Sequence, residues 1–507
     1  MKFPRAAAVS IIAAVALLVS GCAGAGASQS GTSESLTLGA VVQPASLDAA
    51  NASWGDRAPF YQAVYDTLLL AQPDGTLAPF LATSWEYNDD NTKLTLHLRD
   101  GVTFSDGTPL NAAAVKTSLE RFKAGSGPDA SYLTSLDSVT AVDDSTVVLN
   151  LSQPDPAMLN YLSRSAGLVG SPALATSADA NTDPIGSGPY ILDTGRTVIG
   201  SSYVYTRNPN YWNPALQHYN ELTIRVLQDP TAGLNAIRSN EIDALRLLSN
   251  DSLGEIQNVG WKVYPLETEV TGLLLFDRAG ALNPALADVR VRQAINYALD
   301  RQGLLRALQS GLGTVTEQMF PPTSSAFDPA LDQTYPYDPA RARELLAEAG
   351  YPNGLTIQMP SMPVFAPATY SLISQQLADV GITVNDLSVT PEQWVPNMIA
   401  QAYPASFMVL EQNSNWQLIQ FMIAPTAMFN PFHYQDATSS ALIQQVRVGD
   451  EQAGAKAAAD LNAHLVKDAW FAPMYRAQNS FVAAPSVNVV RVPSNVYPNI
   501  YDFTPAS

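Results

Sequence analysis

The sequence predicts a mixed α/β protein with more than one lobe. Segments in which apolar and polar residues alternate are interspersed with segments of helical spacing, so strands and helices are expected to share the core. The two kinds of segment follow no regular β-α order, and no repeat of about 20 to 50 residues occurs, which argues against a TIM barrel, a solenoid or a propeller. At 507 residues, the chain is long enough for two or three domains.

The N-terminal residues have the features of an export signal. A basic start precedes an apolar stretch at 6–19, which is shorter than the about 20 residues that cross a bilayer. Residues 19–22, Val-Ser-Gly-Cys, resemble the bacterial lipobox, in which the cysteine sulfur receives a diacylglyceryl group before cleavage. We therefore predict a signal peptide over residues 1–21 and lipidation of Cys22, the only cysteine. The alternative is a cysteine buried beside a helix.

Residues 22–35 are predicted to form a lipidated, flexible tether. Apart from the cysteine, the side chains of this stretch are small or polar and offer nothing to bury. The folded body is expected to start near Leu36. No later stretch of the sequence is long and apolar enough to span a membrane, so we expect a lipid-anchored protein at the outer face of the cytoplasmic membrane or in the periplasm.

A strand and three helices stand out in the body. Residues 93–99 place three leucines on one face at every second position, and Asp-Gly pairs supply turns after them. Asn111 is the expected N-cap of a first helix that ends in the glycine-rich stretch from 124. Residues 288–301 carry a full apolar stripe, and Asp338 caps a third helix that ends at Gly350.

The composition is that of an ordinary globular protein. Apolar residues make up 46% of the chain and charged residues 14%, which excludes a disordered or coiled-coil protein. The formal net charge of -19 argues against nucleic acid as a partner, because the phosphates would be repelled.

Most catalytic and metal-binding motifs are absent from the sequence. The four histidines form neither an HExxH nor an HxxxH pattern, so no metal site and no cofactor are predicted. No serine lies in a GxSxG pattern, which argues against an elbow hydrolase. Residues 186–188, Gly-Ser-Gly, lack the rest of a phosphate loop and are predicted to form a tight turn before a strand at 190–192, with glycine supplying a positive φ.

Several segments, in one order along the chain, resemble motifs of the family 5 extracellular solute-binding proteins. These are the oligopeptide, dipeptide and nickel receptors of ABC importers. The segments are residues 81–86 with 98–109, then 186–190, 207–212, 288–300 and 337–352. The resemblance is dense over residues 77–352, and the C-terminal third matches only in its general pattern.

The resemblance implies a type II periplasmic-binding fold. Two lobes are joined by two crossover strands, lobe I holds an extra inserted subdomain, and ligand sits between the lobes. The first crossing is expected near residues 270–277 and the return near 476–481. The expected limits are residues 36–271 for lobe I, 272–478 for lobe II and 479–507 for the return to lobe I.

The segment that should carry the ligand contact departs from the family pattern. In peptide receptors of the family, an Asp in lobe II pairs with the α-ammonium of the peptide, and that Asp is missing here. Glu411 is the expected replacement. Otherwise, the ligand would be neutral and Trp416 would stack on it. It would then be held by side-chain amides of this loop, those of Gln412, Asn413 and Asn415. The alternative is a polar surface loop after a buried strand.

Trp54 is the expected contact from lobe I, because it follows the first strand of the body. A core tryptophan is the alternative at this position.

The resemblance therefore implies a binding protein and not an enzyme. It would capture a peptide or similar small solute and deliver it to an ABC permease and its ATPase. Two other functions stay open. One is a secreted hydrolase of glycosidase type, since 46 acidic residues offer many carboxylate pairs. The other is a sensory or adhesive lipoprotein that uses the same fold.

Overall fold

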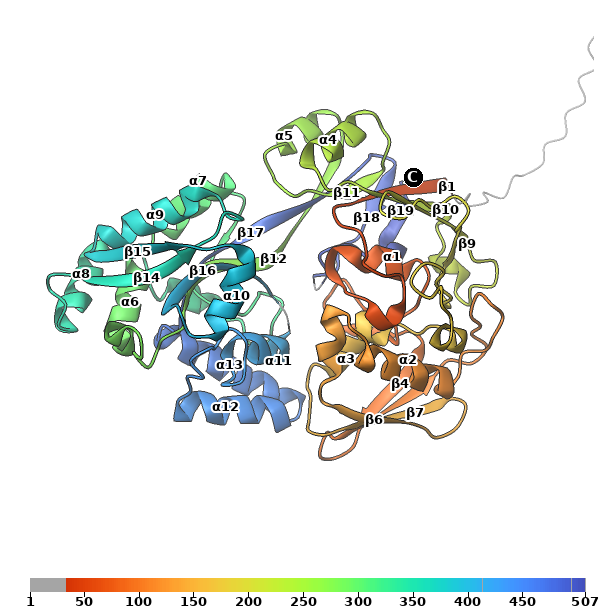
Figure 1. Ribbon diagram of the computed structural model, residues 1–507, viewed down its shortest axis with the longest axis horizontal. Coiled ribbons are helices and arrows are strands. Elements are labelled where there is room, and N and C mark those ends of the chain that lie inside the picture. The colour runs from red at the N-terminus through yellow and green to blue at the C-terminus, as the bar shows by residue number, and fades with distance from the viewer. Residues whose placement is uncertain (1–32, 413, 494, 507) are drawn as a thin grey trace, which may run out of the picture. The chain divides into compact units, whose positions relative to one another are not determined.

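A computed structural model describes residues 33–412, 414–493 and 495–506, and Figure 1 shows its elements in chain order. The predicted signal peptide, Cys22 and Asn413 lie outside these residues. Strand β1 begins at Ser33, inside the range predicted as tether, because its backbone pairs in parallel with β10 from that residue on. The described residues belong to one unit, and none of their helices has the length and hydropathy needed to cross a bilayer.

One large mixed sheet runs through the described residues. Its members, in spatial order, are β16 (Ala405–Glu411), β12 (Lys262–Leu275), β17 (Phe471–Ala483), β11 (Ala244–Arg246), β1 (Ser33–Ala40), β10 (Tyr219–Val226), β9 (Ser202–Arg207) and β8 (Tyr190–Leu192), with β13 (Gly313–Val315) also pairing with β17. We call the part of the chain that holds α1 to α5, together with the C-terminal residues 484–506, lobe I, and the part that holds α6 to α13 lobe II.

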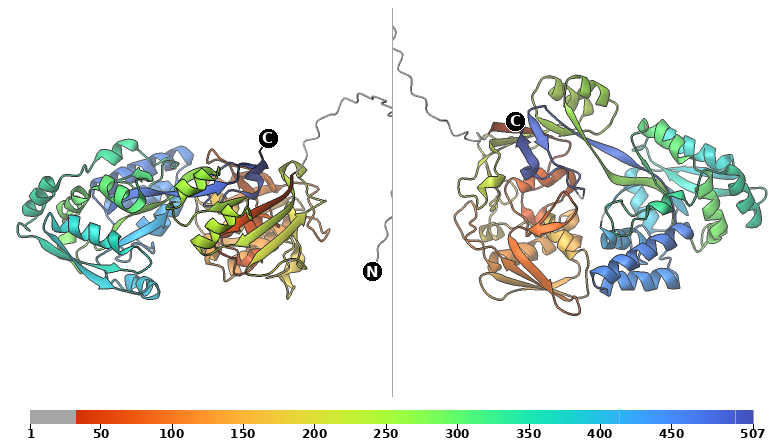
Figure 2. Two further views of the ribbon diagram at one scale, coloured as in Figure 1. Left: turned by 90° about the horizontal axis from the view of Figure 1, so that it is seen from above. Right: turned by 180° about the vertical axis from the view of Figure 1, so that it is seen from behind.

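The long strands β12 and β17 connect the two lobes. They pair antiparallel along their length and stay side by side in all three views (Figures 1 and 2). One half of the pair lies next to β11 of lobe I, and the other half lies next to β16 of lobe II. The register shifts between Leu266 and Glu269, where one half gives way to the other. Both predicted crossings lie in or next to these strands, and the predicted lobe limits stay a prediction.

Lobe I adds a separate antiparallel sheet to its share of the main sheet. Its strands, in spatial order, are β4 (Ala82–Tyr87), β5 (Lys93–Leu98), β7 (Thr146–Leu151) and β6 (Leu136–Ala141). Two further antiparallel pairs of short strands are β2 (Leu69–Ala71) with β3 (Leu77–Pro79), and β18 (Val487–Val489) with β19 (Phe503–Pro505). The helices of this lobe are α1 (Ala58–Gln62), α2 (Ala112–Ala124), α3 (Met158–Leu162), α4 (Pro230–Arg238) and α5 (Leu253–Asn258).

Lobe II contains a parallel pair of strands and most of the helices. The pair is β14 (Leu355–Ser361) and β15 (Ile382–Ser388), connected by α9 (Pro367–Ala378). The other helices are α6 (Val289–Ala298), α7 (Arg301–Gln309), α8 (Pro339–Glu348), α10 (Pro391–Ile399), α11 (Asn415–Leu418), α12 (Ala437–Val448) and α13 (Glu451–Lys467). A π-helix, Ile419–Ile423, continues α11.

The predicted strand and helix starts are confirmed. The three leucines of β5 are buried, and the side chains of Asn111, Asp288 and Asp338 cap α2, α6 and α8. The predicted end of the second helix at 301 is wrong. Helix α6 ends at Ala298, because the next residue is extended and Asp300 caps the separate helix α7.

The chain bends at residues 187–189 before β8, but the predicted reason for the glycines of this segment is wrong. Neither Gly186 nor Gly188 has a positive φ. A Cβ on Gly186 would lie 2.2 Å from the carbonyl oxygen of Val64, and one on Gly188 would lie 2.4 Å from the carbonyl carbon of that residue. Glycine is therefore required here by the close approach of two backbone segments.

Candidate ligand-binding site

A cavity of about 280 Å³ lies beside the register shift of β12, where the two lobes meet. Residues from both lobes line it. They are Ser53, Trp54, Gly55, Asp56, Arg57, Pro128, Asp129, Tyr132, Arg164, Thr268, Glu411, Gln412, Pro493 and Val496. The lining holds three carboxylates and two guanidinium groups, so the cavity is built for a polar, charged solute.

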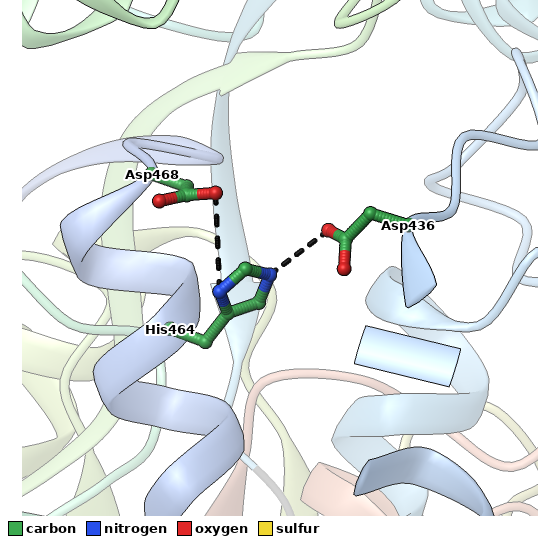
Figure 3. Close-up of side chains that lie close together, drawn as sticks. All are labelled: Asp436, His464 and Asp468. Atoms are coloured by element: carbon green, nitrogen blue, oxygen red, sulfur yellow. Dashed lines mark hydrogen bonds and ion pairs between the residues drawn. The ribbon is translucent and has the colours of Figure 1, made fainter. Parts of the chain in front are cut away.

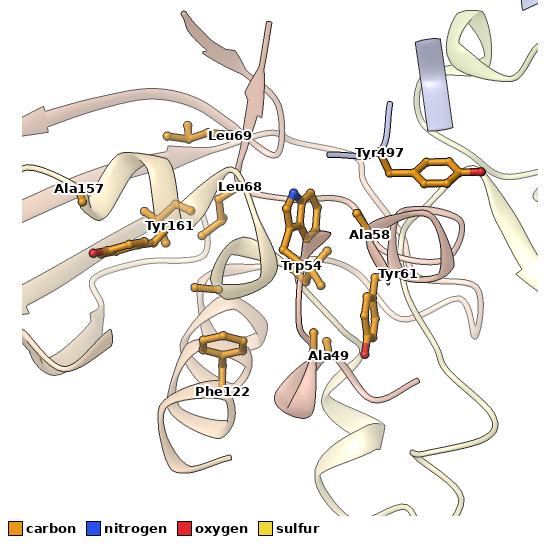
Figure 4. Packing of buried hydrophobic residues seen from close by; sticks show 14 of the residues in the cluster. Ala49, Trp54, Ala58, Tyr61, Leu68, Leu69, Phe122, Ala157, Tyr161 and Tyr497 are labelled. Atoms are coloured by element: carbon orange, nitrogen blue, oxygen red, sulfur yellow. The ribbon is translucent and has the colours of Figure 1, made fainter. Parts of the chain in front are cut away.

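Trp54 forms a fixed part of the wall on the side of lobe I. Its backbone N–H donates to Asp129 at 2.9 Å, and its indole Nε1 donates to Asn495 at 3.1 Å. Figure 4 shows the ring among buried side chains of lobe I, next to Leu68 and Ala58. Only 7% of the residue is exposed. The two sequence interpretations therefore hold together, because Trp54 is a core residue that also faces the cavity.

Asp129 is held in place by the lobe I residues around it. Its carboxyl accepts the Trp54 N–H and a 2.7 Å hydrogen bond from the Ser165 hydroxyl. Burial raises the pKa of Asp129, while these hydrogen bonds oppose the rise. With both hydrogen bonds formed inside lobe I, this carboxyl is in position before any ligand arrives.

Asp56 presents an oxygen without a partner. One carboxylate oxygen pairs with Arg246 at 3.1 Å, whereas Oδ1 is buried and has no hydrogen-bond partner in the described structure. Burial raises the pKa of Asp56, the Arg246 guanidinium lowers it, and the charge of Glu269 raises it further. A buried acceptor without a donor is costly, so this oxygen is suited to receive a donor from a ligand or from water.

Glu411 is the lobe II carboxyl of the cavity. It ends β16 and lies opposite Glu269 of β12, and two like charges in facing positions repel each other. The side chain is exposed, but the protein around it still removes part of its hydration and raises the pKa of the carboxyl. Arg164 opposes this rise, and the charges of Glu269, Asp129 and Asp56 add to it. A cation at this position would relieve the repulsion.

Gln412 connects the first cavity to a second cavity of about 410 Å³. Thr268 and Pro493 also line both. The Gln412 side chain makes one long hydrogen bond, from Nε2 to the Met319 carbonyl at 3.4 Å, and its Oε1 is buried without a partner in the described structure. The second cavity has one ionisable lining residue, Glu267, and is otherwise formed mainly by proline, threonine, leucine and glutamine.

The other two described residues of the predicted site lie apart from the cavity lining. Asn415 accepts a hydrogen bond from the Ser324 hydroxyl and donates to the Ser325 hydroxyl at 2.8 Å. Trp416 is 6% exposed and packs in the hydrophobic core. The structure therefore brings Trp54 and Glu411 together at the cavity. Asn415 and Trp416 instead contact other parts of the protein and support the loop. Asn413 lies outside the described residues.

Among the ionisable lining residues, sequence reasoning missed five: Asp56, Arg57, Asp129, Tyr132 and Arg164. Burial raises the pKa of the Tyr132 hydroxyl to about 12, so this group is a neutral donor or acceptor at physiological pH. Asp56 and Arg57 stand two and three residues after Trp54, and this spacing was the local signal available. The other three reach the cavity through tertiary structure alone.

Comparison with known proteins gives the chain a family. The family described as bacterial extracellular solute-binding proteins, family 5 (middle region), matches residues 76–427, which is more than half of the chain. The glutathione-binding protein GsiB of Escherichia coli is 30% identical over 333 residues, and this stretch covers 64% of the chain and 62% of that relative.

Solved structures show the same fold. The DppA binding protein of Helicobacter pylori, in complex with the peptide STSA, superposes with a TM-score of 0.75 at 20% identity, covering 94% of this chain and 99% of that one. NikA of Brucella suis, in complex with Fe(III)-EDTA, gives a TM-score of 0.78 at 25% identity, covering 93% and 100%. The predicted two-lobed fold is confirmed. The chain belongs to the family 5 bacterial extracellular solute-binding proteins.

Proposed function

We propose that this protein is the receptor of an ABC importer and that it binds a peptide or similar small solute between its lobes. Captured solute is delivered to a permease and its ATPase. The family supports a solute-binding role, and the relatives are named for binding glutathione, a peptide in one complex and a metal chelate in another. The observation that carries the proposal is the charged cavity, which takes residues from both lobes.

The charge pattern of the cavity favours a zwitterionic solute. Glu411 faces Glu269 and gains from a cation, so an ammonium group is the expected partner at the lobe II wall. Arg57 and Arg164 line the same cavity and are suited to a carboxylate of the solute. A free peptide carries both groups.

The second cavity gives room for the rest of such a solute. Because it shares Thr268 and Gln412 with the first, a chain longer than one residue can extend from the charged cavity into the less charged one. Asn413 keeps its proposed role as a ligand contact, since its neighbour Gln412 lines both cavities.

Binding without conversion is part of the proposal. A ligand that contacts both walls stabilises the closed arrangement of the lobes, and moving a population from 1:99 to 99:1 needs a preference of ~5.5 kcal/mol for that arrangement. No chemical step is required for delivery.

Calorimetry on the purified mature protein tests the proposal. Di- and tripeptides with a free N-terminus are compared with their N-acetylated forms, with reduced glutathione and with metal chelates. We expect saturable binding of at least one free peptide and weaker binding of its acetylated form, because acetylation removes the ammonium. Products are followed in the same samples. Turnover of any solute, or binding of none, contradicts the proposal.

We further propose that the mature protein is anchored by lipid at Cys22 on the outer side of the membrane. The lipobox-like residues before Cys22 support this. Cys22→Ser is expected to abolish acylation and to release the protein into the soluble fraction or leave it unprocessed. Unchanged acylation, followed by incorporation of labelled fatty acid, contradicts the anchor.

A further inference from the structure

Three side chains that are common metal ligands lie together in lobe II, at one end of α12 and one end of α13 (Figure 3). His464 is in the last turn of α13, and Asp468 is the C-cap of the same helix. Asp436 is the N-cap of α12. None of the three lines the ligand cavity described above. They therefore form a separate cluster of one imidazole and two carboxylates.

The two helices bring these groups into close range. Residues 464 and 468 are four apart, so they lie on one face of α13. His464 Nε2 is 2.9 Å from Asp436 Oδ2, and His464 Nδ1 is 3.8 Å from Asp468 Oδ2. One ligand atom from each residue can be chosen so that all three lie within 4.8 Å of one another.

The protein offsets the negative charge of the cluster only in part. In the described part of the chain, His464 is the only residue that forms an ion pair with either carboxylate. Arg292 is close to Asp468, but its guanidinium donates to the backbone carbonyl of that residue, at 2.9 Å from Nη2, and not to the carboxylate. With a neutral imidazole, two carboxylates share this site without a full positive charge between them.

The position of Asp468 adds a second, independent reason to expect a cation. The C-terminus of a helix carries a partial negative charge, so a carboxylate at the C-cap of the 17-residue helix α13 is unfavourable. Asp436 has no such penalty, because it stands at a helix N-terminus, where its Oδ1 accepts the Ser439 N–H. A cation between them offsets the repulsion at Asp468 and keeps the cap at Asp436.

We propose that Asp436, His464 and Asp468 bind a divalent transition-metal ion, with Zn²⁺ as the best match. One nitrogen and two carboxylate oxygens suit Zn²⁺, and water completes a tetrahedral site. Tetrahedral bonds of about 2.0–2.1 Å place ligand atoms roughly 3.4 Å apart. The 2.9 Å pair of His464 Nε2 and Asp436 Oδ2 must therefore open by about 0.5 Å, and the widest pair, at up to 4.8 Å, must close by about 1.4 Å at most. The Asp468 side chain is 38% exposed and free to make that movement.

The bound ion would fasten the start of α12 to the end of α13. His464 also packs edge-on against Trp470, whose ring lies 4.5 Å from the guanidinium carbon of the buried Arg278. Fixing His464 therefore steadies a buried part of lobe II. The effect is structural and does not depend on the solute cavity.

Isothermal titration of the purified mature protein with ZnCl₂ at pH 7.5 tests the site. Wild type is expected to bind one ion with a Kd of about 10 µM or below. His464→Gln and Asp468→Asn should each weaken binding at least about 10-fold, since each removes a ligand. Asp436→Asn keeps a helix cap and should weaken binding as well. His433→Gln is the matched control, because His433 is an exposed histidine outside the cluster.

Each result of these measurements either supports the metal site or overturns it. Co²⁺ is used as a second probe, and a four-coordinate site should give its visible absorption in wild type but not in His464→Gln. Melting curves without metal show whether a variant is folded, and Asp468→Asn serves if His464→Gln is not. Absence of one-site binding by wild type overturns the proposal. Equal affinity of wild type, His464→Gln and Asp468→Asn overturns it too, and leaves a hydrogen-bonded Asp-His-Asp cluster only.

Discussion

Two carboxylates of the protein, Asp66 and Glu411, differ in their burial and in their hydrogen bonding. Asp66 is fully buried and accepts four hydrogen bonds, from Ser187 at 3.1 Å, Tyr211 at 3.1 Å, Trp212 at 2.8 Å and Tyr501 at 2.9 Å. Glu411 is exposed and is influenced by its neighbours through charge and lost hydration.

This difference distinguishes a carboxylate that supports the structure, Asp66, from one that is suited to bind a ligand, Glu411. Asp66 has every lone-pair direction occupied by the protein, and the ring of Trp212 is further covered by the Arg99 guanidinium at 4.4 Å. Nothing is left there for a ligand. Within the residues that the structure describes, no hydrogen bond reaches the Glu411 carboxylate, and a second acid lies opposite it, so a partner from outside can complete its chemistry.

The largest expected effect is on stability, from Asp66→Asn. The amide offers one acceptor oxygen where the carboxylate offers two, so donors among the four lose their partner in a buried place. At pH 7, where the carboxyl is ionised, we expect unfolding by guanidinium to show a loss of about 3–5 kcal/mol. The exposed Asp137→Asn is the control and should be neutral. A loss below about 1 kcal/mol would show that Asp66 is not a structural centre.

The pH dependence of stability sharpens the same contrast. Burial raises the pKa of Asp66 to about 6 from 3.8, while its four hydrogen bonds oppose the rise. The pKa of Asp66 is higher in the folded than in the unfolded state, so protonated Asp66 favours the folded state. Its contribution to the free energy of unfolding is therefore complete below pH 3.8 and is lost as the pH rises to about 6. The stability gap between wild type and Asp66→Asn should therefore shrink over this window, by up to about 3 kcal/mol. Paired unfolding curves at pH 4 and pH 7 measure it. A gap that is constant or grows contradicts the assignment.

Glu411→Gln should act on affinity and leave stability nearly unchanged. Losing one charged hydrogen bond to an ammonium weakens binding by about 1.5–3 kcal/mol, roughly 10- to 150-fold. The loss should appear for free peptides and not for their N-acetylated forms. Glu344→Gln, on the outer face of α8, is the control. If free and acetylated peptides lose affinity equally, Glu411 does not contact the ammonium.

Most of the fold could be predicted because local signals carry it. Three of the donors to Asp66, namely Ser187, Tyr211 and Trp212, lie in segments that resemble family motifs. These segments therefore identify the fold. Asp66 itself lies in none of them, so the centre on which they converge could not be seen before the structure.

The ligand cavity could be predicted only in part. Trp54 was found because it follows the first strand, and Glu411 because it stands near the position where the family resemblance expects an Asp. Asp129 and Arg164 come from other segments and reach the cavity by tertiary packing, which leaves no periodic signal. Trp416 was predicted to stack on ligand, and its position in the core shows that an aromatic residue near a loop is as readily used for packing.

The smallest expected effect comes from Asn415→Ala, and it distinguishes the two kinds of ligand considered for this loop. The Asn415 amide oxygen and nitrogen are both hydrogen-bonded, to the hydroxyls of Ser324 and Ser325. Removing the side chain should therefore lower stability by about 1 kcal/mol and binding affinity by less than about 0.5 kcal/mol. If the ligand were neutral and held by amides, the order would reverse, with Asn415→Ala weakening binding more than Glu411→Gln. Calorimetry on both variants with the same peptide decides. The Asn415 amide is already engaged by two hydroxyls, whereas the Glu411 carboxyl accepts no hydrogen bond from the described residues and is repelled by Glu269, so we expect Glu411→Gln to show the larger loss.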